Sequence, residues 1–260
     1  MIIGIIFHFI TKGANEYEKR DFLQIQKDGR IAIVTNLDPI GYYASGDTIS
    51  GYNYELLKAL QQYTPIQFDI TLENSLDKSF EELKNGKYDI IARNIPMNSD
   101  LKNEYNFTSP IIYDKLVLVQ RRPEYNDGKE PIRNHLEMGN ITIHVPKESP
   151  VIFRLKNLSH EIGDTIFVIE DDIYEYMQLS LMVASGDINY TISDYRTAKK
   201  ISNQIPELDV KTDIGFTHLE AWATRKNSTQ LTDSLNVWLE RFSKTKNYQL
   251  LLDKYYSSGK

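Results

Sequence analysis

The sequence predicts an α/β fold with two similar halves, and two observations lead to this prediction. Short β-branched runs alternate with amphipathic helical segments along most of the 260 residues, an order typical of sheets flanked by helices. A weak internal repeat suggests that the second half resembles the first. Residues 80–91 and 181–192 each contain a helical segment that ends at a glycine, followed by a strand that leads into a polar loop. Because any helix–strand unit has this plan, the repeat is only modest support for two lobes.

The first half alternates strands and helices. We expect a spacer or short helix at 16–28, a strand at 30–35, a helix from Gly51 that ends before Pro65, a half-buried strand at 66–72, a helix at 76–84 capped by Asn85-Gly86, and a strand at 88–92. Consecutive β-branched residues predict that strand 30–35 is central and buried. This order is typical of a parallel sheet with helices packed on it.

The second half repeats the alternation after a strand at 115–121 and a surface turn at 122–131 that contains two prolines. We expect strands at 141–145, 165–169, 188–193 and 208–211, helices at 150–158, 173–183 and 195–203, an apolar run at 218–224, and closing helices at 229–243 and 248–256.

Composition and motifs exclude several classes of function. A net charge of −6 without a basic run argues against nucleic acid as a partner. The chain has no cysteine, which excludes disulfides, thiolate metal sites and a cysteine nucleophile. Its five histidines lack an HExxH motif or any pair at ligand spacing, and no GxSxG, strand-linked GxGxxG or GxxxxGK[ST] motif occurs. We therefore expect no metal, no cofactor and no catalytic residue.

The first ten residues (MIIGIIFHFI) form a strongly apolar run. The run is shorter than the roughly 20 residues that span a bilayer, and it resembles the hydrophobic part of a secretory signal followed by Gly13-Ala14. No basic residue precedes it, and Lys12 lies where a small residue is preferred. We expect residues 1–27 to be a cleaved or anchoring export segment with a spacer; the alternative is a first strand of the fold.

Polar residues at predicted strand ends indicate a ligand cleft, because ligands of open α/β sheets bind at the carboxyl ends of the strands. Residues 87–113 would form one wall of this cleft. Asp194, after a buried run, could cap the following helix or pair with a ligand ammonium. Ser149 lies at a helix start suited to an anion, and Tyr42 and Tyr43 could stack on a ligand.

The order of several motifs carries a family resemblance. They are Pro39-x-x-Tyr42, GYNYELL at 51–57, Leu83-x-x-Gly86-x-Tyr-Asp89, NSD at 98–100, FTSPIIY at 107–113, GDINYTISD at 186–194 and Tyr255-Tyr256. Over residues 28–257 this series resembles type II periplasmic solute-binding proteins of the amino-acid-binding class, the bacterial extracellular solute-binding protein family 3. Within that class, NSD, NYTISD and QIPEL at 204–208 look most like the non-catalytic solute-binding-like domain of F-type membrane-bound lytic transglycosylases.

The resemblance implies two α/β lobes, each a mixed sheet flanked by helices, joined by two crossing strands. Lobe 1 would contain residues 28–120 and 216–260, and lobe 2 residues 121–215, with crossings near Arg121 and Gly215. The lysozyme-like domain that follows in the transglycosylases is not found in these 260 residues, so no glycan cleavage is expected of them.

The resemblance also implies roles for individual residues. Tyr42 would stack on the ligand, and Ser149 would begin the anion-receiving helix. Asp194 would receive the ligand ammonium. The segment from Asn94 through Ile95 to Met97 would present backbone groups, and we expect Asn98 to be a further ligand-binding residue.

One departure concerns the ligand carboxylate, which an arginine grips in amino-acid binders. Leu101 stands at that place here, and leucine cannot bind a carboxylate. Arg93 could reach into the cleft instead, or form a surface or interlobe salt bridge. A peptide or cell-wall fragment therefore fits better than a free amino acid.

We expect a periplasmic monomer, free or anchored by its N-terminal segment, that binds a small amine-bearing solute or peptide for uptake or sensing. A membrane transporter or a cell-wall component would be its partner. One alternative is a regulatory or receptor module that contacts a protein or peptidoglycan partner. Another is a dehydratase-like enzyme, for which only Asp194, Glu148 and His144 are placed to act as acid or base.

Overall fold

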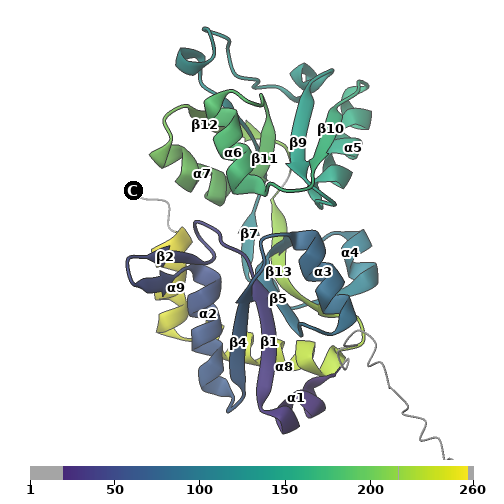
Figure 1. Cartoon of the computed structure of the whole chain (residues 1–260), viewed down its shortest axis with the longest axis vertical. Coiled ribbons are helices and arrows are strands. Elements are labelled where there is room, and N and C mark those ends of the chain that lie inside the picture. Colours follow the sequence, from purple (N-terminus) through teal and green to yellow (C-terminus); the bar gives the residue numbers. More distant parts are fainter. Residues whose placement is uncertain (1–19, 216, 257–260) are drawn as a thin grey trace, which may run out of the picture.

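The computed structural model describes residues 20–215 and 217–256, which form two α/β lobes joined by two crossing segments (Figure 1). The export segment predicted for residues 1–14 lies outside the described residues. Within the described ranges, no helix combines the length and apolar character that a membrane span requires.

Lobe 1 is built on a six-stranded sheet in the order β4-β1-β5-β13-β6, with β7 also paired to β13. The strands are β1 (Arg30–Thr35), β4 (Gln67–Leu72), β5 (Ile90–Pro96), β6 (Tyr105–Phe107), β7 (Ile112–Asp114) and β13 (His218–Arg225). β1 runs parallel to β4 and β5, and β13 is antiparallel to its neighbours. The α-helices are α1 (Phe22–Asp28), α2 (Tyr52–Leu60), α3 (Leu76–Asn85), α4 (Ser99–Glu104), α8 (Thr229–Ser243) and α9 (Lys246–Tyr256). A separate hairpin pairs β2 (Tyr43–Ser45) with β3 (Thr48–Ser50).

Lobe 2 contains a five-stranded sheet in the order β10-β9-β11-β8-β12. The strands are β8 (Leu116–Arg121), β9 (Thr142–Pro146), β10 (Phe167–Asp171), β11 (Thr191–Asp194) and β12 (Leu208–Asp213). Helices α5 (Val151–Ile162), α6 (Tyr176–Ser185) and α7 (Tyr195–Gln204) flank this sheet. The mixed sheets and the two lobes confirm the predicted fold class.

Local sequence explains how helix α2 begins. Gly51 precedes it with φ at 134°, and a Cβ atom built there would lie 2.3 Å from the carbonyl oxygen of Gly41. Only glycine allows this close approach of the two backbone segments. The apolar face of α2, including Leu56 and Leu60, is fully buried against the sheet.

Buried polar side chains hold segments of lobe 1 together through two hydrogen-bond networks. The Asp89 carboxylate is fully buried and accepts hydrogen bonds from Arg20 Nη2 at 2.8 Å, Arg225 Nη2 at 3.0 Å and the backbone N–H of Ala32 at 2.9 Å. In the second network, the indole N–H of the fully buried Trp222 donates to Asn53 Oδ1 at 2.9 Å. Paired in this way, the Asp89 carboxylate and the Trp222 indole do not incur the cost of unmet hydrogen bonds.

The first crossing between the lobes differs from the predicted position near Arg121. β7 pairs with β13 in lobe 1, whereas β8 pairs with β11 and β12 in lobe 2, so the chain crosses at Lys115. The prolines after residue 121 resemble a boundary, but β8 is an inner strand of the second sheet, and an apolar run does not reveal which sheet it joins. The second crossing lies between β12 and β13, around the predicted Gly215.

Strand β5 also continues four residues beyond the predicted end at Ala92. Ile95 and Pro96 pair with Ala221 and Glu220 of β13, so the polar loop begins after this strand rather than inside it. Short elements that the sequence did not predict are α4, β6, β7 and the β2–β3 hairpin.

Candidate functional site

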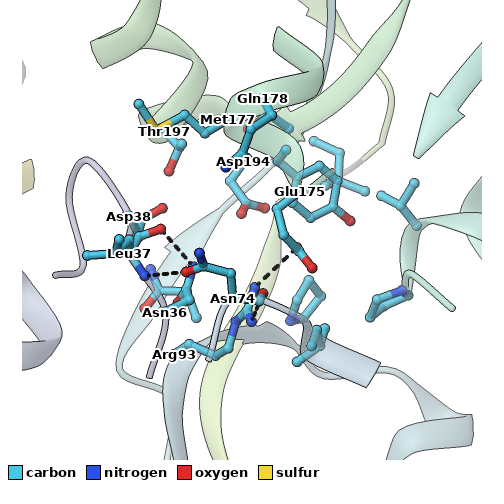
Figure 2. Close-up of a pocket in the computed structure, with 18 of the residues that line it drawn as sticks. Asn36, Leu37, Asp38, Asn74, Arg93, Glu175, Met177, Gln178, Asp194 and Thr197 are labelled. Atoms are coloured by element: carbon cyan, nitrogen blue, oxygen red, sulfur yellow. Dashed lines mark hydrogen bonds and ion pairs between the residues drawn. The ribbon is translucent and has the colours of Figure 1, made fainter. Parts of the chain in front are cut away.

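A cavity of about 330 Å³ lies between the lobes, where the carboxyl ends of strands from both sheets meet. Asn36 and Asp38 follow β1, Asn74 follows β4, and Ser193 and Asp194 end β11; all five line the cavity. Figure 2 shows Asn36, Asp38 and Asn74 of lobe 1 facing Asp194 of lobe 2. This position matches the cleft predicted from the polar strand ends.

Among the residues that the structure describes, four charged ones line the cavity: Asp38, Arg93, Glu175 and Asp194. Three are acidic and one is basic, so the charged lining is predominantly negative when all four are ionised. Asp38 is partly used by its own loop, because Oδ1 accepts the backbone N–H of Ile40 at 2.8 Å.

Arg93 forms an ion pair across the cleft. Its side chain comes from β5 in lobe 1, and Nη2 lies 3.7 Å from Oε2 of Glu175, the residue that precedes α6 in lobe 2. Nη1 donates to the backbone oxygen of Asn74 at 3.0 Å. Burial raises the pKa of Glu175 above its ordinary value, while the nearby Arg93 charge opposes that rise. Of the alternatives open for Arg93, the structure contains the interlobe salt bridge (Figure 2).

Asp194 lies at the position before α7, but its side chain makes no capping hydrogen bond to that helix. Its carboxylate points into the cavity, and the side chain is 23% exposed (Figure 2). Burial raises the pKa of Asp194 well above its usual range, and the nearby carboxylates of Glu220 and Asp114 raise it further.

Two side chains that no sequence motif indicated lie beside Asp194. His218 Nε2 is 3.9 Å from Asp194 Oδ1 and 3.1 Å from Glu220 Oε1. Glu220 is fully buried, and that burial together with the Asp114 charge raises its pKa to about 8. His218 and Glu220 share one face of β13 because they are two residues apart, which is the only signal in the sequence that could have linked them.

Asn94 lines the cavity as part of a chain of amides. Its Oδ1 accepts from Asn53 Nδ2 at 3.3 Å, and its Nδ2 donates to the Tyr256 hydroxyl at 3.2 Å. The cavity thus brings together three of the predicted residues: Arg93, Asn94 and Asp194.

Ser149 lies directly behind the lining formed by Pro150, Val151 and Tyr176. Its hydroxyl is hydrogen-bonded to the Tyr176 hydroxyl and accepts the backbone N–H of Val151 at 3.2 Å. The start of α5 therefore uses the Ser149 hydroxyl within its own loop.

Tyr42 and Tyr43 are not among the residues that line the cavity. Tyr42 is buried and packs edge-on against Tyr54, with ring centroids 5.4 Å apart. The Tyr43 ring faces α7 of the other lobe, with Lys200 Nζ 4.2 Å from its centroid. Tyr43 therefore contributes to contact between the lobes.

The segment after Asn94 is held by local structure and does not line the cavity except at Pro96. Ile95 is fully buried, and the Met97 N–H donates to the Leu219 oxygen at 3.0 Å. Asn98 caps α4, with Oδ1 accepting the Leu101 N–H at 2.8 Å. Leu101 packs against the lobe 1 core.

Two lobes on two crossings, with a polar cavity between them, define the class of two-lobed binding proteins with the type II periplasmic fold. The bacterial extracellular solute-binding protein family 3 model matches residues 30–258, so the chain belongs to this family. The family predicted from the motif order is confirmed.

Curated relatives of this chain are membrane-bound lytic murein transglycosylases F. The chain is 26% identical to that of Cronobacter sakazakii over 241 residues, which cover 90% of this chain and 44% of the relative. It is 21% identical to that of Pseudomonas fluorescens over 252 residues, covering 95% of this chain and 50% of the relative. The chain therefore spans about half the length of the curated relatives it matches.

Solved structures share the fold. Holo ArgBP from T. maritima has a TM-score of 0.72 at 20% identity, covering 91% of this chain and 100% of the other. An ancestral amino acid-binding protein, a precursor of cyclohexadienyl dehydratase, has a TM-score of 0.74 at 16% identity, covering 90% of this chain and 98% of the other.

Proposed function

We propose that this protein binds a small amine-bearing solute in the interlobe cavity, without catalysis, for uptake or sensing. The solute would be an amino acid derivative, a peptide or a muropeptide fragment of the cell wall. The observation that carries the proposal is the acidic balance of the charged lining, in which the Asp194 carboxylate faces the cavity.

An entering ammonium fits Asp194 electrostatically. Burial and neighbouring carboxylates hold the pKa of Asp194 high, so the free protein resists its ionisation. A cation in contact with this carboxyl favours the ionised form and forms a charge-assisted hydrogen bond with it.

The cavity offers fewer groups that could bind a ligand carboxylate. Arg93 is the one basic residue of the lining within the described ranges, and its guanidinium is paired with Glu175. The Ser149 hydroxyl is used within its own loop, and Leu101 packs into the core. These contacts favour a ligand whose carboxylate is blocked or absent over a free amino acid.

Binding would act on the arrangement of the lobes. Asp38 and Asn74 line the cavity from lobe 1, and Asp194 and Gln178 line it from lobe 2, so one ligand can contact both. A ligand with contacts to both lobes stabilises the closed state over the open one.

The proposal is tested by ligand-induced thermal shift and calorimetry with amino acid amides, dipeptide amides and muropeptides, each paired with its N-acetylated form. We expect binding by compounds with a free amine and a loss of about 2 kcal/mol or more, roughly thirtyfold, in Asp194→Asn. Asp233→Asn, an exposed carboxylate on α8, is the matched control. Equal binding of acetylated and free compounds, or undiminished binding by Asp194→Asn, would refute the site.

A second candidate function is a regulatory or receptor module of a cell-wall system, supported by the transglycosylase relatives. On either function we propose a periplasmic location. An uncleaved N-terminal segment fits anchored sensing, and a cleaved one fits a free carrier, so N-terminal sequencing of the mature protein from cell fractions distinguishes them.

A further inference from the structure

Four ionisable side chains meet where the two lobes are joined, and we call them the hinge cluster: Asp114, Asp194, His218 and Glu220. Asp114 ends β7 just before the first crossing, and His218 begins β13 just after the second. The two are register partners in adjacent strands. Asp194 reaches the same place from the end of β11 in lobe 2.

The cluster is short of positive charge. Among the described residues, the basic group placed against it is Arg196, whose Nε lies 3.9 Å from Asp114 Oδ2. Three carboxyl groups thus face one guanidinium and one imidazole. Oε2 of Glu220 is fully buried and has no hydrogen-bond partner in the described chain. A buried carboxylate oxygen without a donor is costly unless a proton or another cation neutralises it.

Three members of the cluster have the spacing of metal ligands. The ligand atoms of Asp194, His218 and Glu220 all lie within 4.8 Å of one another. The His218 nitrogen is 3.1 Å from Glu220 Oε1 and 3.9 Å from Asp194 Oδ1. Tetrahedral bonds of about 2.0–2.1 Å place two ligand atoms about 3.3 Å apart, so small side-chain movements would bring all three atoms onto one ion.

We propose that Asp194, His218 and Glu220 bind a divalent first-row transition metal ion, with Zn²⁺ as the best fit. One imidazole and two carboxylates suit this class of ion, whereas Ca²⁺ and Mg²⁺ prefer sites built of oxygen alone. The sequence did not predict the site because its ligands come from separate segments and lack a helical metal motif. The set is also incomplete: with three protein ligands, a fourth position remains for water or a bound solute.

The geometry gives the ion two effects. Asp194 belongs to lobe 2 while His218 and Glu220 belong to lobe 1, so the ion would hold the lobes together at the hinge. Asp194 also lines the cavity, so the ion and a ligand ammonium would compete for one carboxylate.

Cobalt substitution tests the metal site directly. The full chain, freed of metal by chelation, is titrated with Co²⁺ and followed by visible absorption, then with Zn²⁺ by calorimetry. We expect one ion per chain with a tetrahedral cobalt spectrum, and at least tenfold weaker binding in His218→Gln and in Glu220→Gln. His160→Gln, an exposed histidine on α5, is the matched control and should bind as the unchanged chain does.

The outcome of the metal test can be distinguished from the outcome of the amine-binding test. The cobalt spectrum requires no solute, so failure to find an amine ligand leaves the metal test intact. If both proposals hold, Zn²⁺ weakens amine binding, and Asp194→Asn weakens binding of both. The metal proposal is overturned if Co²⁺ gives no tetrahedral spectrum, or if folded His218→Gln and Glu220→Gln proteins, checked by circular dichroism, bind it undiminished.

Discussion

Replacing Glu175 by glutamine should open the cleft and change which ligands it accepts. The variant removes the charge that faces Arg93 across the lobes while keeping nearly the same shape. Arg93 is 6% exposed, so in the closed state it would retain the Asn74 oxygen as a partner but lose its counter-charge.

The size of the effect follows from the geometry. At 3.7 Å and an effective dielectric constant of about 20, the attraction is about 4 kcal/mol. Part of this is offset by desolvation of both groups, so we expect a net loss of about 1.5–3 kcal/mol from the closed state. Since 1.4 kcal/mol is tenfold, the ratio of closed to open protein should fall roughly ten- to hundredfold.

The absence of cysteine from the chain makes this measurable, because two introduced cysteines can be labelled without competition. Exposed helix positions Glu81 in α3 and Lys156 in α5 place one fluorophore on each lobe. Energy transfer between them should report a wider distribution of distances in Glu175→Gln. The control is Asp172→Asn, which removes the same charge from a lobe 2 side chain that is 75% exposed.

The same variant should gain affinity for carboxylates, since an unpaired guanidinium in the cavity can bind a carboxylate through two hydrogen bonds. Calorimetry with a free amino acid and with its amide measures the affinity of the unchanged chain and of the variant for each compound. If Glu175→Gln leaves both the distance distribution and the preference for the amide unchanged, the Arg93 pair neither holds the lobes together nor limits carboxylate binding.

Two further predictions concern stability and pH. Asp89→Ala should lower the free energy of unfolding by about 3–5 kcal/mol, measured by urea denaturation, because it leaves Arg225 buried without its carboxylate; a loss below about 1 kcal/mol would contradict this. A hydrogen bond to Asp77 of lobe 1 raises the pKa of Glu148 in lobe 2, so this contact favours the closed state at low pH and is lost as pH rises through the raised pKa. The contribution of this contact to the closed fraction, seen by energy transfer, should therefore fall as pH rises above the ordinary glutamate range, and Asp77→Asn should reduce that dependence.

Most of the fold could be predicted because its segments carry strong local signals. β1 and α8 have the predicted bounds: one is an unbroken β-branched run, and the other has regular helical spacing of Leu231, Leu235 and Trp238. The three-residue strands β6 and β7 are too short for any periodicity, so pairing with β13 rather than local preference defines them.

The site was only partly predictable for a different reason. Polar residues at strand ends are visible in the sequence, and Asp194 was found in this way, whereas Asn94 followed from the family resemblance. The partner of Arg93 lies 82 residues away on another lobe, and that separation leaves no local pattern. The same holds for His218 and Glu220, which meet Asp194 only because β13 begins and β11 ends at the same hinge.

Strand β13 has a mechanical consequence. It is hydrogen-bonded along its length to β5 on one side and to β6 and β7 on the other, so it cannot slide within lobe 1. Motion of lobe 2 must then be taken up at Lys115 and between β12 and β13. We therefore expect lobe 2 to rotate relative to lobe 1 about an axis close to these two connections. Side chains far from the axis move most during closure, whereas groups near it, such as His218, keep nearly the same neighbours throughout.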